Sequence, residues 1–381
     1  MAEMTSRERI LAVLRREMPD RVPLSPRIGA WMKERYGNVT FLEYLDLKKQ
    51  FGYDPIITVM PDVPYPVYTQ FVDYGRIGDI EIELTSERKD RKLYVSRTVR
   101  TPAGSLHDRS VFPPPGREYG IIPDPEKLEP LVKDSADLER LRYLLPSPDS
   151  FGGFSFERID SSIGSDGMLQ VRPHKGVDHL LMFTLGYEPA LMMYYDDRDL
   201  LFATLRLFHD YYIGLLRYCL ERGARMIFES WYNCSLSAGW SPEIYEECFL
   251  PLIIEDARIV HEHGAYFHFY DDGKIMPILH LLRRVGADLI SPLCPPPMGD
   301  VDAEEIKREL GPHVALNGFV ELQTVRFGTP REVEEKVRYA IETLGHGGGY
   351  ILGTNDSIRD GSPIENVAAF FEAGRKYGRY S

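Results

Sequence analysis

The chain has 381 residues, of which 43% are hydrophobic and 27% are charged, and its formal net charge is −13. This is the composition of a globular protein, and the acidic balance argues against binding to nucleic acid or to an anionic membrane surface. No apolar run approaches the roughly 20 residues of a membrane span, and the N-terminus lacks the apolar core of a signal peptide.

The first elements are expected within the N-terminal 60 residues. Thr5 and Glu8 have the spacing of a capping box at the start of a helix. Residues 21–27 are expected to form a short extended segment, and residues 53–59 a strand.

Residues from about 70 to 118 have a different pattern. Residues 80–84 and 94–99 alternate between apolar and polar side chains, and the charged stretch 85–92 joins them. A further strand follows residues 101–106. The pattern predicts an antiparallel β-hairpin inserted into a larger domain.

From about residue 150 onward, strand patterns alternate with long helical patterns. Proline and capping residues at Ser241, Thr329 and Ser362 predict helix starts. Glycines 223, 264, 286 and 345 predict helix ends, and glycines 347–349 a helix stop with a tight turn. The expected strands are residues 168–172, 225–232, 266–271, 287–293, 313–319 and 349–354.

With the two N-terminal strands, the count is eight. Repeated βα units of this number predict a (β/α)₈ TIM barrel that forms a single domain over residues 1–381, with the hairpin as its insertion. A doubly wound open sheet is the alternative. It is disfavoured because no Gly-x-Gly-x-x-Gly turn follows the first strand.

Four expected strands end in polar or titratable side chains, which is where barrel enzymes place their active sites. The richest end is the stretch from Ala265 to Gly273, where period two puts His268, Tyr270 and Asp272 on one face. A tyrosine and a carboxylate two residues apart can exchange a proton with a reacting oxygen or ligate a hard metal. They can also simply hydrogen-bond neighbouring loops.

Other strand ends supply further candidates with equally open alternatives. Glu229 lies in an apolar strand, where a carboxylate is costly unless it is functional or paired in a structural salt bridge. Asp356 follows the last strand and Asn317 precedes a glycine, so both are either site residues or ordinary turn residues.

Several motifs along the chain resemble the uroporphyrinogen decarboxylase superfamily, which includes that decarboxylase and cobalamin-dependent methyltransferases. The resemblance covers nearly the whole chain and agrees with a (β/α)₈ barrel. It is carried by Thr5-Ser-Arg-Glu-Arg-Ile-Leu, Asp20-Arg-Val-Pro, Thr101-Pro-Ala-Gly-Ser-Leu, Ser241-Pro-Glu-Ile-Tyr, Pro297-Met-Gly-Asp-Val-Asp, Gly328-Thr-Pro-Arg-Glu-Val, Gly347-Gly-Gly-Tyr-Ile-Leu and Pro363-Ile-Glu-Asn-Val.

Two departures from the family patterns bear on the reaction. The decarboxylase has an arginine-rich loop for propionate groups, whereas residues 25–31 offer only Arg27. Thiol methyltransferases of the superfamily bind zinc through a His-x-Cys motif and a distant cysteine. The corresponding positions here are Tyr270, Asp272 and a position near Asp356, so the soft zinc ligands are missing.

The resemblance therefore implies an O-demethylase that takes a methyl group from a methoxylated compound, such as an aryl methyl ether. The acceptor would be the cobalt(I) corrinoid (cobalamin) of a partner protein. The expected catalytic residues are Tyr270, Asp272, Glu229, Asp356 and His268. The expected substrate-binding residues are Arg27, Trp231, Tyr232, Asn233, Phe269, Asn317 and Phe319.

Some alternatives stay open. A bound metal such as zinc would take its ligands from Asp272, Asp356, Glu229 or His268. The rival functions are a tetrapyrrole decarboxylase, a thiol methyltransferase with an altered metal site, and a protein that binds a corrinoid or another ligand without catalysis. The four cysteines form no Cys-x-x-Cys pair, and a reducing cytoplasm is the simplest location. Whether the chain forms a homodimer is left open.

Overall fold

A computed structural model of the chain describes residues 3–61, 75–114, 125–151, 153, 155–174 and 176–380. The chain divides into two compact units. Unit 1 comprises Met1–Met60, Ser155–Pro173 and Cys219–Ser381, and unit 2 comprises Pro61–Phe154 and His174–Tyr218. The single domain expected from the sequence stays a prediction.

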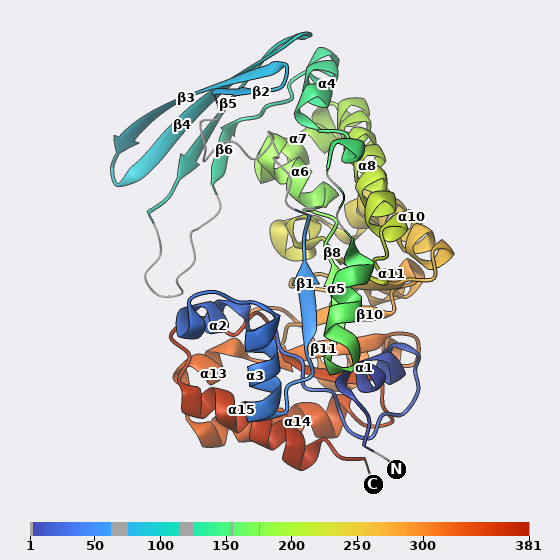
Figure 1. Cartoon of the computed structure of the whole chain (residues 1–381). Helices are drawn as coiled ribbons and strands as arrows, with labels where there is room; N and C mark the ends of the chain where they lie inside the picture. Colours follow the sequence, from blue (N-terminus) through green and yellow to red (C-terminus); the bar gives the residue numbers. More distant parts are fainter. Residues whose placement is uncertain are drawn as a thin grey trace. The chain divides into compact units, whose positions relative to one another are not determined.

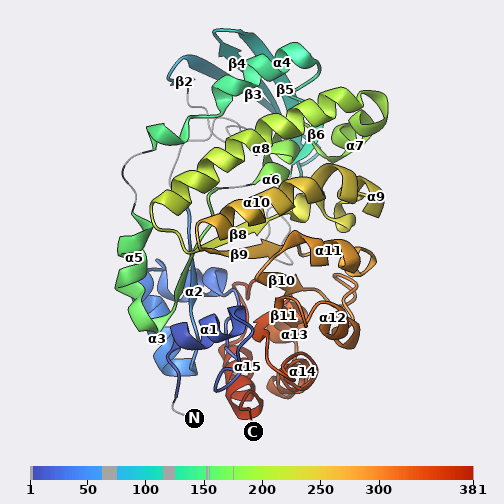
Figure 2. The ribbon, with the colours of Figure 1, turned by 90° about the vertical axis from the view of Figure 1, so that its right-hand side faces the viewer.

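Unit 1 is built on a curled sheet of seven parallel strands. The strands are hydrogen-bonded in the order β1-β7-β8-β9-β10-β11-β12, and Figure 2 shows β8 to β11 following one another in this order. All six strands predicted after residue 150 are present, each within a few residues of its expected bounds. The strands are β1 (Ile56–Val59), β7 (Met168–Val171), β8 (Met226–Ser230), β9 (Tyr266–Tyr270), β10 (Leu289–Leu293), β11 (Ala315–Val320) and β12 (Tyr350–Thr354).

The strand expected at residues 21–27 is reduced to a single parallel bridge between Leu24 and Leu352. Pro23 and Pro26 have no amide hydrogen, so this segment cannot form a full ladder. It still reaches both edges of the sheet, because Ser25 donates to Leu352 O at 2.9 Å and Asp54, just before β1, donates to Leu24 O at 2.9 Å. A curled, barrel-like α/β fold is therefore present, and closure into an eight-stranded barrel stays a prediction.

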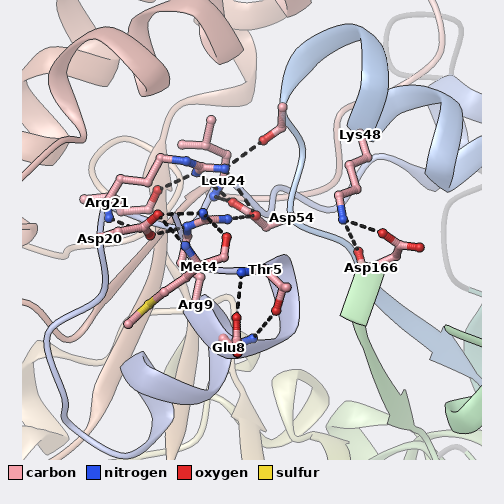
Figure 3. Close-up of polar contacts among 12 residues, drawn as sticks. Met4, Thr5, Glu8, Arg9, Asp20, Arg21, Leu24, Lys48, Asp54 and Asp166 are labelled. Carbon is pink, nitrogen blue, oxygen red and sulfur yellow. Dashed lines mark hydrogen bonds and ion pairs between the residues drawn. The ribbon is translucent and has the colours of Figure 1, made fainter. Parts of the chain in front are cut away.

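A buried ionic network holds this segment in place (Figure 3). The carboxylate of Asp54 accepts from Leu24 N at 2.9 Å, Arg9 Nη1 at 2.6 Å and Arg21 Nη1 at 2.8 Å. Asp20 accepts from Arg9 Nε at 2.6 Å. The side chains of Arg9 and Asp54 are only 3% and 1% exposed, so these charges depend on one another.

The helices of unit 1 lie outside the sheet, except α1, which covers its N-terminal end. Ile10, Val13 and Leu14 of α1 belong to one buried cluster with the first interior residues of the strands, among them Met226 and Ala315. Figure 1 shows α1, α3, α14 and α15 around the strands. The helices are α1 (Ser6–Leu14), α2 (Gly29–Tyr36), α3 (Phe41–Phe51), α5 (Phe156–Ile163), α9 (Pro242–Ile244), α10 (Leu250–Glu262), α11 (Leu279–Val285), α12 (Ala303–Glu309), α13 (Leu322–Phe327), α14 (Pro330–Leu344) and α15 (Ile364–Tyr377), with a π-helical turn at Tyr245–Phe249.

Most predicted helix signals are confirmed. Thr5 and Thr329 form capping boxes, and the Ser241 side chain caps α9. The prediction that Ser362 caps a helix is wrong. The N-cap of α15 is Pro363, so Ser362 lies one residue too early for its side chain to reach the N3 amide.

Helix ends follow the glycines. Gly264 and Gly286 end α10 and α11 with φ of +68° and +77°, the left-handed conformation that favours glycine. Before β12, glycines 347–349 form the tight turn that was expected, with φ between +70° and +80°.

Unit 2 contains a five-stranded antiparallel sheet in the order β2-β3-β4-β5-β6. The predicted hairpin is its centre, but the charged stretch 85–92 was wrongly assigned as the connection. Pairing continues to Lys89 and Lys92, and only Asp90 and Arg91 form the turn, with φ of +50° and +64°. The strands are β2 (Gly75–Ile77), β3 (Ile80–Lys89), β4 (Lys92–Thr101), β5 (Gly104–Phe112) and β6 (Glu126–Glu129).

The charged residues near this turn are tolerated within strands because residues 85–89 are all exposed. Of the predicted insertion at 70–118, residues 70–74 and 115–118 lie outside the described part of the chain. The helices of unit 2 are α4 (Ser135–Leu141), α6 (Val177–Thr184), α7 (Tyr187–Asp196) and most of α8 (Arg198–Glu221). None of the helices in the described residues is both long and apolar enough to cross a membrane.

Candidate active site

The end of β9 presents its polar side chains to the interior of the curled sheet. His268 and Tyr270 contact the same interior ring, that of Phe228, with centroid distances of 5.0 Å and 5.1 Å. The period-two alternation in the sequence therefore assigned these two residues to one face correctly.

His268 is the centre of a buried hydrogen-bonded layer. Its Nδ1 lies 2.8 Å from Gln170 Oε1 and its Nε2 lies 2.6 Å from Ser291 Oγ, while Gln170 Nε2 donates to Thr58 Oγ1 at 2.7 Å. Burial, with a smaller effect from the Arg27 charge, lowers the pKa of His268 to about 3. The imidazole is therefore neutral, and both its nitrogens are engaged beneath the site.

Above this layer, Tyr270 connects Arg27 to Asp272. Arg27 Nη1 donates to the Tyr270 hydroxyl, which in turn donates to Asp272 Oδ2 at 3.2 Å. The guanidinium carbon of Arg27 also lies 4.8 Å from the centroid of the Tyr270 ring. Tyr270 is 2% exposed, whereas the Arg27 side chain is 48% exposed, so the cluster reaches solvent at Arg27.

Asp356 joins this group from the loop after β12. Its Oδ1 lies 4.0 Å from Arg27 Nη1 and accepts from Ser357 N at 2.6 Å, while its Oδ2 accepts from Arg359 Nη2 at 2.7 Å. Asp356 is thus held by two cationic partners. The structure brings together Arg27, Tyr270, Asp272 and Asp356, four of the residues expected from the sequence.

Burial makes these groups hold their protons more tightly. Burial first, and then the negative charge of Asp356, raises the pKa of Asp272 to about 6, although Arg27 acts in the opposite direction. The pKa of Tyr270 is raised well above its usual value, mainly by burial. Asp272 is therefore a carboxyl group that can exist in either protonation state near neutral pH.

Glu229 lies on the other face of β8. It accepts a hydrogen bond from Trp231 Nε1 and interacts with Asp256 of α10. Burial raises the pKa of Asp256 well above its usual value, so this side chain can carry the proton that two adjoining carboxyl groups need. The costly buried carboxylate noted in the sequence thus has a structural partner, outside the Tyr270 cluster.

Of the residues expected to bind substrate, some lie near the Tyr270 cluster and others face away from it. The Tyr232 ring lies 6.3 Å from the Tyr270 ring and adjoins the cluster. Trp231 contacts Phe249, and Phe269 alternates with the interior residues of β9. Neither faces the cluster.

Asn233, Asn317 and Phe319 also have other neighbours. The backbone carbonyl of Asn233 accepts from Trp240 Nε1 at 3.2 Å, and the side-chain amide of Asn317 donates to Ile351 O at 3.0 Å. Phe319 lies against Tyr339 of α14, with ring centroids 6.0 Å apart, because its φ of +87° breaks the strand alternation.

Two residues at the same edge of the sheet escaped the sequence reasoning. Arg172 directly follows β7 and donates to Ser230 Oγ at 2.6 Å. Cys294 directly follows β10 and its Sγ donates to Asn355 O at 3.1 Å. The pKa of Cys294 is raised by burial first and then by the nearby charge of Asp272. The available signal was a polar residue at the end of a predicted strand for Arg172, and one directly after a predicted strand for Cys294.

In the described residues, no three His, Cys, Asp or Glu side chains form a group that could hold a metal ion. Of the four expected ligands, only Asp272 and Asp356 lie in one cluster. Glu229 faces away, and both nitrogens of His268 are engaged. The described residues therefore do not fit a zinc site.

Comparison with known proteins identifies the family. The model of the family described as "Uroporphyrinogen decarboxylase (URO-D)" matches residues 180–377, slightly more than half of the chain. The chain belongs to the uroporphyrinogen decarboxylase family. The resemblance found in the sequence motifs is thereby confirmed.

Family members with curated names are distant. The chloroplastic uroporphyrinogen decarboxylase of Nicotiana tabacum is 29% identical over 46% of this chain and 42% of its own length. The uroporphyrinogen decarboxylase of Prochlorococcus marinus is 26% identical over 69% of this chain and 75% of its own. The chain thus spans less than half the length of the first relative and three quarters of the second.

A solved structure shares the fold over nearly the full length. It is a methyltransferase from Methanosarcina mazei with a TM-score of 0.62 and 18% identity, covering 98% of this chain and 99% of that one. At 18% identity, this similarity supports a shared fold and says nothing about the reaction.

Proposed function

We propose that this chain is a methyltransferase that demethylates a methoxylated aromatic compound and passes the methyl group to the cobalt(I) corrinoid of a partner protein. The observation that carries the proposal is the hydrogen-bonded pair of Tyr270 and Asp272 at the end of β9. It presents a carboxyl group with a pKa of about 6 where barrel enzymes carry out their chemistry.

A proton on Asp272 would make the ether oxygen a better leaving group. When the bond between the methyl carbon and oxygen breaks, its electron pair stays on oxygen, which is a poor leaving group unless it gains a proton. Asp272 can supply that proton, directly or through the Tyr270 hydroxyl, and the product is a phenol. The new bond to the methyl carbon uses an electron pair from the acceptor.

Arg27 and Asp356 tune this step. The Arg27 charge lowers the pKa of Asp272, and the Asp356 charge raises it, so together they keep the carboxyl group poised near neutral pH. We assign proton transfer to Asp272 and Tyr270, and positioning to Arg27, Asp356 and His268. Glu229, which faces α10, is left to positioning β8.

The surroundings suit an aromatic substrate. The ring centroids of Phe228 and Tyr232 lie 5.1 Å and 6.3 Å from that of Tyr270 at the end of the sheet, where the three rings can contact a substrate ring. The exposure of Arg27 keeps the cluster accessible to a methyl acceptor carried by another protein. A reduced corrinoid supplies the nucleophile in the cobalamin-dependent branch that the sequence resembles. The fold shared with a methyltransferase is consistent with this proposal.

The second candidate is decarboxylation of a porphyrinogen, which the names of the curated relatives favour. Such a substrate carries many carboxylates and needs several cationic partners. Among the described residues of the Tyr270 cluster and the adjoining strand ends, we find three arginines, Arg27, Arg172 and Arg359, and the first and last are paired with Asp356. This supply of cations favours a smaller substrate.

One experiment separates the two candidates. The protein is incubated without oxygen with cob(I)alamin and a panel of methoxyarenes, and in parallel with uroporphyrinogen. Demethylation consumes the cob(I)alamin absorbance and releases a phenol, whereas decarboxylation releases carbon dioxide without any cobalt. Carbon dioxide release with no phenol from any methoxyarene would reject the proposal in favour of the second candidate.

A further inference from the structure

Arg172 has an unusual set of contacts at the end of β7. Its Nη2 donates to Ser230 Oγ at 2.6 Å, and its guanidinium carbon lies 5.6 Å from the centroid of the Phe228 ring. Its Nε is buried and has no hydrogen-bond partner in the described part of the chain. The Arg172 side chain is half-buried, and it forms no ion pair with a carboxylate in the described part of the chain.

This arrangement leaves a charge and a donor unsatisfied at one place. A half-buried charge without a counter-ion costs free energy, so such a group usually has a partner in the functional state. The buried Nε cannot be reached by a ligand, but the two Nη groups of an arginine present parallel donors that match the two oxygens of a carboxylate. The missing partner is therefore an anion with two coplanar oxygens.

The aromatic rings beside Arg172 indicate what kind of molecule carries the anion. Phe228 lies under the Arg172 guanidinium and 5.1 Å from Tyr270, the ring that carries the proposed proton donor. A ligand that contacts both rings can place one end at Arg172 and the other at Tyr270 and Asp272. A planar aromatic molecule with substituents at two positions has this form.

We propose that the aromatic substrate carries a carboxylate that Arg172 binds through its two Nη groups, so that the methoxyl group is directed toward Tyr270 and Asp272. The inference rests on the proposed function for the methoxyl group, but not for the carboxylate. It makes Arg172 a specificity-determining residue that selects methoxybenzoates over neutral methoxyarenes.

Arg27 is a weaker candidate for the same role. Its guanidinium already donates to Tyr270 and lies 4.0 Å from Asp356. Arg359 also has a buried Nε without a partner, but its charge is compensated by Asp356 at 2.7 Å. Of these three arginines, Arg172 alone has no carboxylate partner in the described part of the chain.

The test measures binding and therefore does not need turnover. Dissociation constants are measured by calorimetry for the ortho, meta and para isomers of methoxybenzoate, each compared with its methoxybenzamide, which has the same shape and no charge. We expect the wild-type protein to favour at least one carboxylate isomer about tenfold or more over its amide. Arg172→Gln should remove this preference and leave amide binding unchanged.

The matched control is Arg225→Gln, an exposed arginine just before β8, at the opposite end of the sheet from Arg172. It should keep the preference. Equal binding of carboxylate and amide by the wild type, or a preference that survives in Arg172→Gln, would overturn the inference. A carboxylate preference that depends on Arg172, in a protein that demethylates nothing, would support the inference and reject the proposed function.

Discussion

The hydroxyl of Tyr270 donates a 3.2 Å hydrogen bond to Oδ2 of Asp272, two residues further along the chain. The pairing arises because residues two apart share one face of a strand, and Asp272 continues that face just beyond the end of β9. Arg27 binds the tyrosine from the other side. The three groups form one chain of hydrogen bonds from solvent to the carboxyl group.

Replacing Asp272 by Asn should abolish proton delivery while keeping the shape of the site. The amide oxygen can still accept from Tyr270, but the amide has no acidic proton to give. We expect the rate of phenol release from a methoxyarene to fall about 10²- to 10⁴-fold in single-turnover experiments. Asp166→Asn, in an exposed ion pair with Lys48, is the matched control and should keep its rate. A rate within threefold of wild type for Asp272→Asn would show that another group supplies the proton.

The rate should depend on pH with the sign of a required acid. Burial and Asp356 raise the pKa of Asp272 to about 6, so the protonated form predominates below this pH and declines above it. The rate of methyl transfer is therefore expected to fall about tenfold per pH unit well above pH 6. A pH series of single-turnover rates between pH 5 and 8 tests this, and a rate that rises with pH would contradict the assignment.

Arg27 should set the midpoint of that profile. Its positive charge lowers the pKa of Asp272, so removing it lets burial and Asp356 raise the pKa further. Arg27→Gln is expected to move the midpoint of the rate profile to higher pH, together with a lower maximal rate from the lost hydrogen bond to Tyr270. Arg225→Gln, an exposed arginine at the other end of the sheet, should leave the midpoint unchanged. An unchanged midpoint in Arg27→Gln would show that the charge of Arg27 does not affect the pKa of Asp272.

Asp272 should also reduce the stability of the fold at neutral pH. The folded state binds more protons than the unfolded state between pH 3.8 and about 6, so the free energy of unfolding declines as pH rises through this window. The cost is complete above pH 6, where its upper limit is about 3 kcal/mol.

Asp272→Asn should therefore be more stable than wild type at pH 7.5 and equally stable below pH 4. The difference between the two proteins isolates Asp272 from the other titrating groups. All three tryptophans, Trp31, Trp231 and Trp240, belong to unit 1, so their fluorescence in urea reports on the unit that contains the site. A variant less stable than wild type at pH 7.5 would contradict this account.

The sequence predicts a strand end well where the rule is local. Alternation placed His268 and Tyr270 together, and capping residues marked α1 and α14, because these signals depend on neighbours within four residues. The sequence did not predict a side chain's contacts where the contacting residue lies on another helix or strand. No residue close to Glu229 in the sequence reveals that Asp256 of α10 interacts with it. Phe319 shares a strand end with Val320, but its positive φ, next to Gly318, turns its ring to α14.

Two further outcomes depended on distant residues. Arg172 was assigned to a strand, and its role at the edge becomes visible only with Phe228 and Ser230 beside it. The segment 21–27 has a strand-like pattern, but because of its prolines it forms only a single β-bridge, between Leu24 and Leu352. A hydrogen bond from Leu24 N to the Asp54 carboxylate holds it in addition.

Asp54 should consequently be the most sensitive ionic residue of unit 1 (Figure 3). Asp54→Asn leaves the buried guanidinium of Arg9 with Asp20 as its one carboxylate partner in the described chain and weakens the contacts to Arg21 and Leu24. Removing one member of such a buried group costs about 3–5 kcal/mol. Asp166→Asn breaks a pair whose side chains are 29% and 47% exposed, and such pairs contribute ~0–1 kcal/mol.

Urea unfolding followed by tryptophan fluorescence should show a large drop in midpoint for Asp54→Asn and almost none for Asp166→Asn. If both variants unfold at the wild-type midpoint, the segment around Leu24 is held by its backbone bonds to Leu352 and Asp54, and not by charge. The double variant Arg9→Met with Asp54→Asn decides between these explanations. Removing the orphaned guanidinium should recover part of the loss if burial of an unpaired charge is its cause.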